Sequence, residues 1–251
     1  MSPNSSLCIR TERVMLINTK GIILHSTKYS DTSLVVKIYT EARGTQSFIV
    51  KGVFGKKGKL RPALFASLAL VNLTFDDNPR HNLKYIREMS LQHTPSDLSF
   101  DPVRSSILMF YNELLYKLLP EAGEDVVLFH FLEQEITDVA GVGELSPDRP
   151  LRFMIRLSVV LGFFPENNYS ERDCHFSLAE GRFQSYYVDE HNDLPEDESR
   201  YLSQLICDDE VVRADRTLRN SLLRYLIQYY IIHNEQIRTI ESVDVLAAVL
   251  H

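Results

Sequence analysis

The sequence predicts an α+β protein in which a small β-barrel is followed by a mostly α-helical domain. Three observations predict this arrangement. Short runs rich in Val, Ile, Thr, Tyr and Phe fill residues 15–91, helical spacing of apolar residues begins after Pro95, and the charge changes sign near the same point. We therefore expect a disordered leader at 1–14, a barrel domain at 15–95 and a helical domain at 96–251.

Five β-strands are expected in the first part of the chain. The run Thr32–Thr40 has the two-residue period of a half-buried strand, in which the set Leu34, Val36 and Ile38 alternates with the set Val35, Lys37 and Tyr39. Turn residues Asp76-Asp77-Asn78-Pro79 separate the last two strands. The expected strands are Met15–Leu24, Thr32–Thr40, Thr45–Val53, Ser67–Phe75 and Leu83–Leu91. Five strands without a helix of ordinary length fit a five-stranded barrel of the OB type.

Six helices are expected after Pro95. The first begins at Asp101-Pro102, where Asp is a good cap and Pro suits the first helical position. The others are Val126–Ala140, Arg149–Leu161, Glu196–Cys207, Asp215–Asn234 and Ser242–Leu250. Residues 163–195 form a small, irregular and polar insertion, in which His175–Leu178 and Arg182–Val188 are expected to pair as a hairpin.

The bulk composition is typical of a globular protein in a reducing compartment. Hydrophobic residues make up 44% of the chain and charged residues 24%. The most apolar helical run, Leu222–Ile232, is interrupted by Arg224 and Gln228, so no membrane span is expected. The three cysteines are far apart and form no CxxC pair, which argues against a disulfide framework and against a cysteine-rich zinc site. A cytosolic setting is the default for such a chain.

Charge is strongly segregated along the sequence. Residues 15–93 carry 12 Lys and Arg against 5 Asp and Glu, a net charge of +7, whereas residues 94–251 carry 13 against 28, a net charge of −15. This asymmetry predicts a polyanionic partner for the basic part.

The strongest local feature is the basic segment 51–61, KGVFGKKGKLR, which has five cations, three glycines and no acid. Such a segment can follow an irregular phosphate backbone, and its Phe can stack on an exposed base. The candidate nucleic-acid-binding residues are Lys37, Lys51, Phe54, Lys56, Lys57, Lys59 and Arg61. A solvated basic hairpin is the alternative interpretation. A P-loop is not indicated, because five residues separate Gly52 from Gly58 and Leu60 stands where Ser or Thr is required.

Two groups of arginines lie in the acidic part. Arg149, Arg152 and Arg156 have the i, i+3, i+7 spacing of one helix face. Guanidinium groups suit carboxylates, so this face could dock an acidic peptide, although pairing with carboxylates of the same chain is the more common role. The second group consists of Arg213, Arg216, Arg219 and Arg224.

No catalytic residue, metal site or cofactor is expected. Cys174 and His175 are adjacent, and neighbouring side chains on a strand point to opposite faces. The acidic clusters 196–198 and 208–210 are explained by the preference of carboxylates for helix N-termini.

The order of these segments resembles the RecO family of bacterial recombination mediators. The barrel part is similar to that family at Gly21–Leu24, Tyr29–Val36, Tyr39–Gly44 and Val50–Gly52, the last with lysines after it. The helical part is similar at Leu151–Phe153, Val160–Pro165, Leu222–His233 and Ser242–Leu246. The likeness extends over nearly all of residues 15–251.

The resemblance implies binding of single- and double-stranded DNA, annealing of complementary strands, and work with RecR to load RecA onto SSB-coated DNA. It also implies that the acidic C-terminal tail of SSB docks near Arg152, and that the protein is cytoplasmic and associated with the nucleoid. Many relatives carry a four-cysteine zinc site, but here the region Pro165–Val188 contains only Cys174, so zinc is not expected.

Two other functions stay open. An OB-fold RNA-binding or ribosome-associated factor without catalytic activity would use the same kind of basic segment, because stacking and phosphate contacts do not read the 2′-OH. A nuclease that uses the acidic clusters is the third possibility. The large helical domain with its arginine groups favours the mediator.

Overall fold

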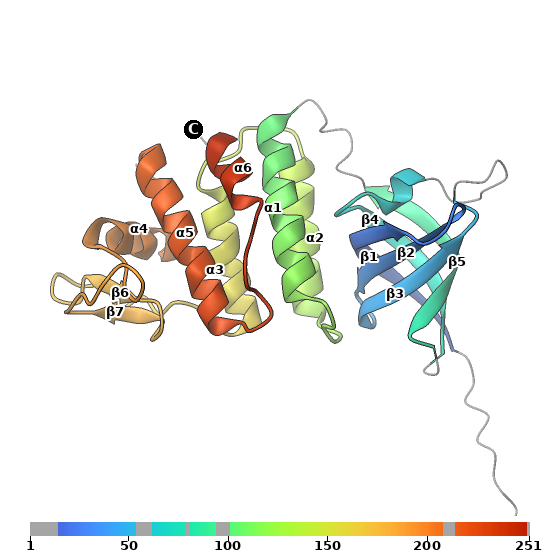
Figure 1. Cartoon of the computed structure of the whole chain (residues 1–251), viewed down its shortest axis with the longest axis horizontal. Coiled ribbons are helices and arrows are strands. Elements are labelled where there is room, and N and C mark those ends of the chain that lie inside the picture. Colours follow the sequence, from blue (N-terminus) through green and yellow to red (C-terminus); the bar gives the residue numbers. More distant parts are fainter. Residues whose placement is uncertain (1–14, 54–61, 79–80, 94–100, 208–213, 250–251) are drawn as a thin grey trace, which may run out of the picture.

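The computed structural model describes residues 15–53, 62–78, 81–93, 101–207 and 214–249. Within these ranges a barrel and a group of helices lie side by side along the long axis of the molecule (Figure 1). The expected leader and the candidate residues Phe54, Lys56, Lys57, Lys59 and Arg61 lie outside the described residues.

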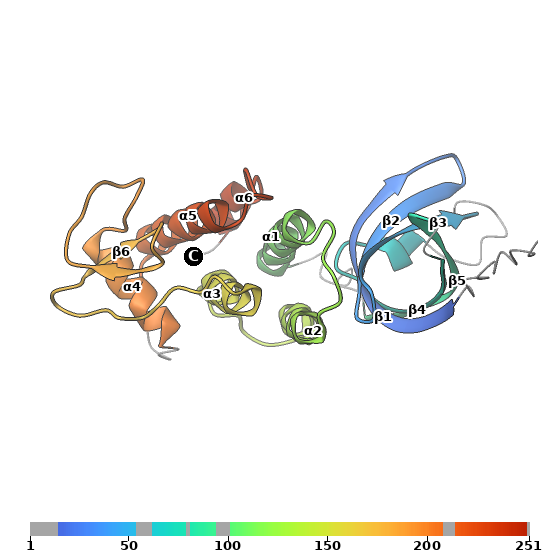
Figure 2. The same cartoon turned by 90° about the horizontal axis from the view of Figure 1, so that it is seen from below.

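Five strands form a closed ring, as the sequence predicted (Figure 2). They are β1 (Met15–Lys28), β2 (Ser33–Thr40), β3 (Gly44–Lys51), β4 (Leu70–Asp77) and β5 (Leu83–His93). The pairs β1–β2, β2–β3, β1–β4 and β4–β5 are antiparallel, and a parallel β3–β5 pair closes the ring. A 3-10 helix, η1 (Pro62–Phe65), precedes β4.

The alternating side chains of β2 point to the barrel interior and to its outer surface in turn. Val36 and Ile38 are fully buried in the barrel core together with Phe48 and Phe75, whose rings meet edge to face at 5.1 Å. Tyr39, from the alternate set, is nevertheless also 0% exposed. The sequence could not show this, because the covering surface comes from the helical part of the chain.

Six helices follow the barrel in the described residues: α1 (Pro102–Leu118), α2 (Val126–Ala140), α3 (Arg149–Leu161), α4 (Glu196–Ile206), α5 (Arg216–His233) and α6 (Val243–Val249). The Asp101 carboxylate accepts a hydrogen bond from the Arg104 amide at 3.0 Å, which makes it the expected N-cap of α1. Gly162 ends α3 with a φ of 84°, a conformation that favours glycine.

The expected hairpin in the insertion is present as β6 (His175–Ser177) and β7 (Arg182–Gln184), with a second strand shorter than expected. Phe176 and Phe183 meet edge to face at 5.1 Å, and Phe176 also lies 5.7 Å from the Tyr229 ring of α5. Aromatic packing therefore attaches this insertion to the helices. In the part of the chain that the structure describes, no group of three or more His, Cys, Asp and Glu side chains could hold a metal ion.

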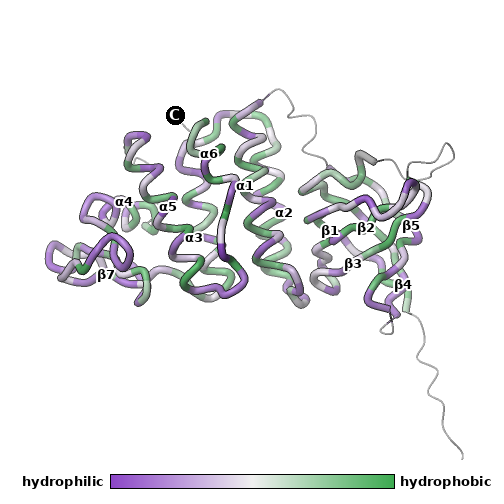
Figure 3. Tube along the Cα trace, viewed as in Figure 1, coloured by the Kyte–Doolittle hydropathy of each residue, from purple (hydrophilic) through white to green (hydrophobic). Residues whose placement is uncertain are grey.

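One hydrophobic cluster extends across the barrel and the helices, beside a separate cluster that fills the barrel. Ile22, Leu24 and Tyr39 belong to the same buried cluster as residues of α1 to α6. Figure 3 shows hydrophobic stretches both on the barrel strands and on α1 and α2. This shared core fixes the orientation of the barrel on the helices.

The turn between β2 and β3 makes close backbone contact with the loop after α1. The Thr45 amide donates to the carbonyl oxygen of Ala122 at 2.8 Å, and the Thr45 hydroxyl donates to that of Leu119 at 2.7 Å. Gly44 has a φ of 61°, and a Cβ atom added there would lie 2.1 Å from the Ala122 oxygen. Only glycine fits this contact.

None of the helices within the described ranges has the length and apolar character needed to cross a bilayer.

Candidate nucleic-acid interface

A row of apolar side chains crosses the outer surface of three barrel strands. Val35 of β2 pairs with Ile49 of β3, and Ile49 pairs with Tyr85 of β5. Val35 and Ile49 are half-buried, and Tyr85 is 48% exposed. We call these three residues the outer strip. Both views place β5 on the side of the barrel away from the helices (Figures 1 and 2).

Lys51 lies at the Tyr85 end of the outer strip. It is the last residue of β3 and is exposed, and its Nζ lies 5.5 Å from the centre of the Tyr85 ring. This is the distance of a cation–π contact. Because Lys51 is also the first residue of the basic segment, the chain leaves β3 beside this exposed ring and continues into the predicted lysine cluster.

Lys37 points to a different place. Its Nζ lies 5.5 Å from the centre of the Tyr116 ring of α1, and that ring is 4.8 Å from the ring of His25. Lys37 is half-buried and pairs with Ser47 in the β2–β3 ladder, whereas Lys51 pairs with Ser33. The structure therefore does not bring these two predicted lysines together. Lys37 lies at the junction with α1.

Several other cations of the barrel are neutralised by carboxylates. Ion pairs join Lys20 to Glu133, Arg43 to Asp77, Lys84 to Asp77 and Arg87 to Asp76. Burial alone would raise the pKa of the Asp77 carboxyl, but hydrogen bonds from Lys84 and Arg43 outweigh burial and lower that pKa. Lys51, in contrast, forms no ion pair with a described residue and keeps its charge available.

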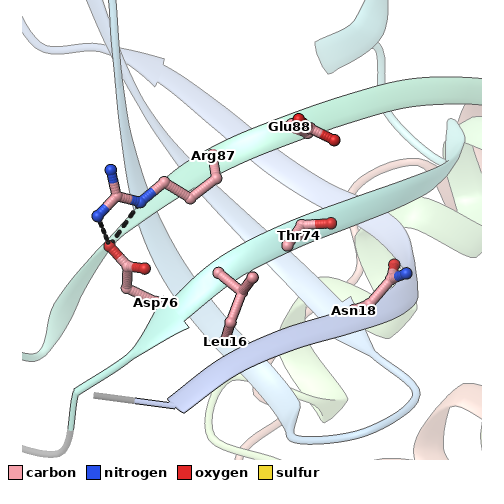
Figure 4. A pocket seen from close by; sticks show the side chains of 6 residues that line it. All are labelled: Leu16, Asn18, Thr74, Asp76, Arg87 and Glu88. Carbon is pink, nitrogen blue, oxygen red and sulfur yellow. Dashed lines mark hydrogen bonds and ion pairs between the residues drawn. The ribbon is translucent and has the colours of Figure 1, made fainter. Parts of the chain in front are cut away.

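A second outer face, over β1, β4 and β5, contains a hollow of about 570 Å³. Figure 4 shows its lining, in which the Arg87 guanidinium is held by Asp76. The other lining residues are Leu16, Asn18, Thr74 and Glu88. Glu88 adds a carboxylate that no described cation pairs with, so this face does not favour phosphate. The outer strip with Lys51 is the better candidate for nucleic acid.

The first arginine group is only partly available to a partner. Arg149 lies 3.0 Å from the buried carboxylate of Glu135 and 3.2 Å from Asp138, both from α2. Burial would lower the pKa of Arg149, but these two carboxylates raise it above its ordinary value. Pairing within the chain, the alternative interpretation from the sequence, therefore holds for Arg149.

The second half of α3 and the residues after it carry both an exposed arginine and exposed apolar side chains. The side chain of Arg156 is 52% exposed, with a nitrogen 3.6 Å from Glu135. Val159 and Phe164, near the end of the same helix, are 54% and 56% exposed. Arg152 is half-buried on the same helix. The second half of α3 and the residues after it thus carry one exposed cationic side chain and two exposed apolar side chains.

The second arginine group supports the fold. Arg219 forms a buried ion pair of 2.9 Å with Asp148, whose carboxylate also accepts a hydrogen bond of 2.7 Å from the Tyr201 hydroxyl. Arg216 donates to the carbonyl oxygens of Ala247 and Ala248, and Arg224 pairs with Asp244. Arg213 lies outside the described residues.

Sequence reasoning missed Tyr85. A tyrosine within the run Leu83–Leu91 looks like any aromatic residue of a strand. That β5 pairs with β3 cannot be read from the local sequence. The available signal was the alternation of this strand, which places Tyr85 on the same face as the charged Arg87.

The closed five-stranded barrel, joined through a shared core to a helical domain, defines a two-domain protein of the OB-fold class. Comparison with known families then makes the assignment specific. Residues 15–95 match the family model described as "Recombination protein O N terminal", and residues 99–238 match "Recombination protein O C terminal". The chain belongs to the RecO family.

Individual relatives agree with this assignment. The chain is 32% identical over 236 residues to the DNA repair protein RecO of Phocaeicola vulgatus, a match that covers 92% of this chain and 98% of that protein. It is 31% identical over 237 residues to the protein of the same name from Bacteroides fragilis, with the same coverage. For Christiangramia forsetii the identity is 28% over 236 residues, again covering 92% and 98%. Membership of this family supports a role in DNA repair and recombination.

Proposed function

We propose that this protein is a recombination mediator without catalytic activity, which binds single- and double-stranded DNA on its barrel and anneals complementary strands. With RecR, it helps to load RecA onto SSB-coated DNA of the nucleoid. The observation that carries the proposal is Lys51, which forms no ion pair with a described residue and lies beside the exposed Tyr85 ring, on a domain whose sequence has a net charge of +7.

The physical basis of the DNA binding is charge. Lysines that contact phosphates release condensed counterions, which gives an affinity that is independent of sequence and falls as salt rises. The helical part, with a net charge of −15, repels phosphate. Since the shared core holds the two parts against each other, this repulsion favours a strand path on the barrel, away from the helices.

The salt dependence of single-strand binding tests the proposal. Replacing Lys51, Lys56, Lys57, Lys59 and Arg61 by Gln should flatten the plot of log affinity against log salt by about 0.7 per lost phosphate contact, or roughly 3.5 in all. Fluorescence anisotropy of a labelled oligonucleotide at several salt concentrations measures this slope.

Two single substitutions, one in the basic segment and one far from it, give a matched test and control. Lys51→Gln should lower the slope by about 0.7. Arg182→Gln removes the same charge from an exposed position in β7 and should leave the slope unchanged. An unaltered slope in the fivefold variant would remove the basic segment from the DNA site.

Two assays separate the mediator from its alternatives. Competition between single-stranded DNA and RNA of equal length distinguishes it from an RNA-binding factor, and incubation of DNA with Mg²⁺ distinguishes it from a nuclease. Annealing of SSB-coated complementary oligonucleotides, with and without RecR, tests the mediator role directly.

We further propose that the acidic tail of SSB docks at α3, near Arg152. The support is Arg156, whose 52% exposed side chain on the same helix suits the carboxylates of an acidic peptide. Arg149 contributes less, because Glu135 and Asp138 occupy its guanidinium group.

Calorimetric titration with an SSB-tail peptide tests this docking site. Arg152→Ala should weaken peptide binding by about 1.5–3 kcal/mol, the range for a hydrogen bond to a charged group, and should leave DNA affinity unchanged. Arg224→Ala, which removes a cation from α5, is the control and should bind the peptide normally. Loss of both peptide and DNA binding in Arg152→Ala would contradict a separate site.

A further inference from the structure

We propose that Tyr85 is the platform on which the barrel stacks an unpaired base, with Lys51 placed to hold the adjoining phosphate. The proposal rests on the proposed DNA binding and deepens it, because it assigns the preference for single strands to one aromatic ring.

The twelve tyrosines of the chain differ in their environments. Five of them are almost completely buried: Tyr39, Tyr111, Tyr201, Tyr229 and Tyr230. Tyr85 is 48% exposed, and its ring stacks on no aromatic side chain of the described residues. Among the described residues, the Lys51 ammonium lies against its ring. An exposed ring on a strand, with a cation above it, is available to a ligand.

The two groups match the two parts of one nucleotide. A nucleotide links a flat base to a phosphate, so a site for both needs a ring and a cation next to each other, as Tyr85 and Lys51 are. A cation–π contact at an exposed site is weaker than base–aromatic stacking. An incoming base can therefore displace the ammonium from the ring, and the ammonium can then turn to the phosphate.

The outer strip extends this site along the barrel. Ile49 lies directly beside Tyr85 and Val35 directly beside Ile49, so the ring continues into an apolar surface across β3 and β2. The faces of a barrel of this type formed by strands 2 and 3 bind oligonucleotides in other proteins. Stacking tolerates every base, because each base has a π-face, and so the site would not read sequence.

A duplex cannot use the ring in the same way. Its bases are paired and stacked on one another, and it presents phosphates to a protein surface of this kind. Lys51 therefore serves both kinds of DNA, whereas Tyr85 serves the single strand alone. The ratio of single- to double-strand affinity is the quantity that reports on Tyr85.

The test uses the full-length protein with oligothymidine and with a blunt duplex of the same length. Tyr85→Ala should weaken single-strand binding by about 5- to 150-fold, the effect of losing one stacked base, and change duplex binding by less than about twofold. Tyr85→Phe should keep both affinities. Tyr186→Ala removes a tyrosine that is 61% exposed in the helical part and should change neither.

A spectroscopic variant gives an independent readout. The chain contains no Trp, so Tyr85→Trp introduces a single tryptophan at the site. Stacking on a base should quench its emission when oligothymidine is added, and the duplex should leave the emission nearly unchanged. Circular dichroism confirms that each variant is folded.

The outcomes separate this inference from the proposed function. If the unaltered protein binds neither kind of DNA, the proposed function fails. If it binds DNA with the Lys51-dependent salt slope, but Tyr85→Ala keeps full single-strand affinity, only the stacking inference fails. Equal losses for single strand and duplex would also overturn it, because the ring would then merely position Lys51.

Discussion

At the scale of single residues, the Glu113 carboxylate shows how a few hydrogen bonds set the acid stability of a segment. This residue of α1 accepts hydrogen bonds from Lys117 at 2.6 Å, from the Ser242 amide at 2.7 Å and from the Glu241 amide at 2.9 Å. Burial raises the pKa of Glu113, but these hydrogen bonds outweigh burial and lower the pKa to about 2. The carboxylate thereby ties the chain before α6 to α1.

The lowered pKa of Glu113 predicts how protein stability depends on pH. Because the folded-state value of about 2 lies below the ordinary value of 4.5, the contribution of Glu113 to stability is complete above pH 4.5 and is lost as pH falls towards 2. Glu113→Gln should lower the free energy of unfolding by about 1.5–3 kcal/mol at pH 7. Urea unfolding at pH 7 and pH 3 measures this difference, which should shrink at pH 3.

A control separates this residue from general acid effects. Glu144 is exposed in the loop between α2 and α3, so Glu144→Gln should match the unaltered protein at both pH values. A difference between Glu113→Gln and the unaltered protein that stays constant with pH would contradict the proposed role of the carboxylate.

The sequence predicted on which helix or strand a side chain lies better than it predicted which side chain it contacts. The spacing of Arg149, Arg152 and Arg156 correctly placed them on one helix, α3. Glu135, which pairs with Arg149 and Arg156, comes from α2 and could not be read from that spacing. Likewise, Lys51 was identified from local composition, whereas its neighbour Tyr85 is brought close by a strand that starts more than 30 residues later.

At the scale of elements, helix bounds were predictable wherever local signals set them. The bounds predicted for α2 and α3 are the observed ones, because capping by Asp125 and termination by Gly162 are local effects. The ends of the strands depended on distant partners. β1 continues to Lys28 because its last residues pair with the start of β2, where Lys28 lies opposite Leu34.

The end of β4 was predicted wrongly for a similar reason. Asp76 and Asp77 are typical turn residues, yet both belong to β4, which ends at Asp77. Arg43, from the β2–β3 turn, and Lys84, from β5, hold the Asp77 carboxylate, which makes the extended conformation favourable. Ion pairs across the sheet thus outweighed the local turn preference.

At the scale of the whole molecule, the segregation of charge along the sequence becomes a separation of charge in space. The basic and acidic parts of the sequence correspond to the barrel and the helices, which pack against each other through a shared core. Where they meet, opposite charges pair, as Lys20 does with Glu133 at 2.8 Å. Lys51, which forms no ion pair with a described residue, lies beside Tyr85 of β5, the strand on the side of the barrel away from the helices. Charge therefore contributes both to the junction and to the candidate DNA surface.

The shared core also predicts how the protein unfolds. The sequence suggests that residues 15–95 are a separate domain, but Ile22, Leu24 and Tyr39 are fully buried in a cluster that includes the helices. Exposing such side chains costs about 1.5–3 kcal/mol each. The isolated segment 15–95 should therefore be much less stable than the same barrel within the intact chain, and the intact chain should unfold in one transition.

Calorimetry of the intact protein and circular dichroism of the segment test this coupling. We expect a single heat-capacity peak for the intact chain, and a melting temperature for the segment at least about 10 °C lower, since about 1 kcal/mol shifts a domain of this size by 4–8 °C. Adding the separate helical segment 96–251 should restore part of the lost stability, because it supplies the other half of the core. Two independent peaks in the intact chain, with the first at the melting temperature of the segment, would show that the barrel folds without the helices and that the junction is only a contact.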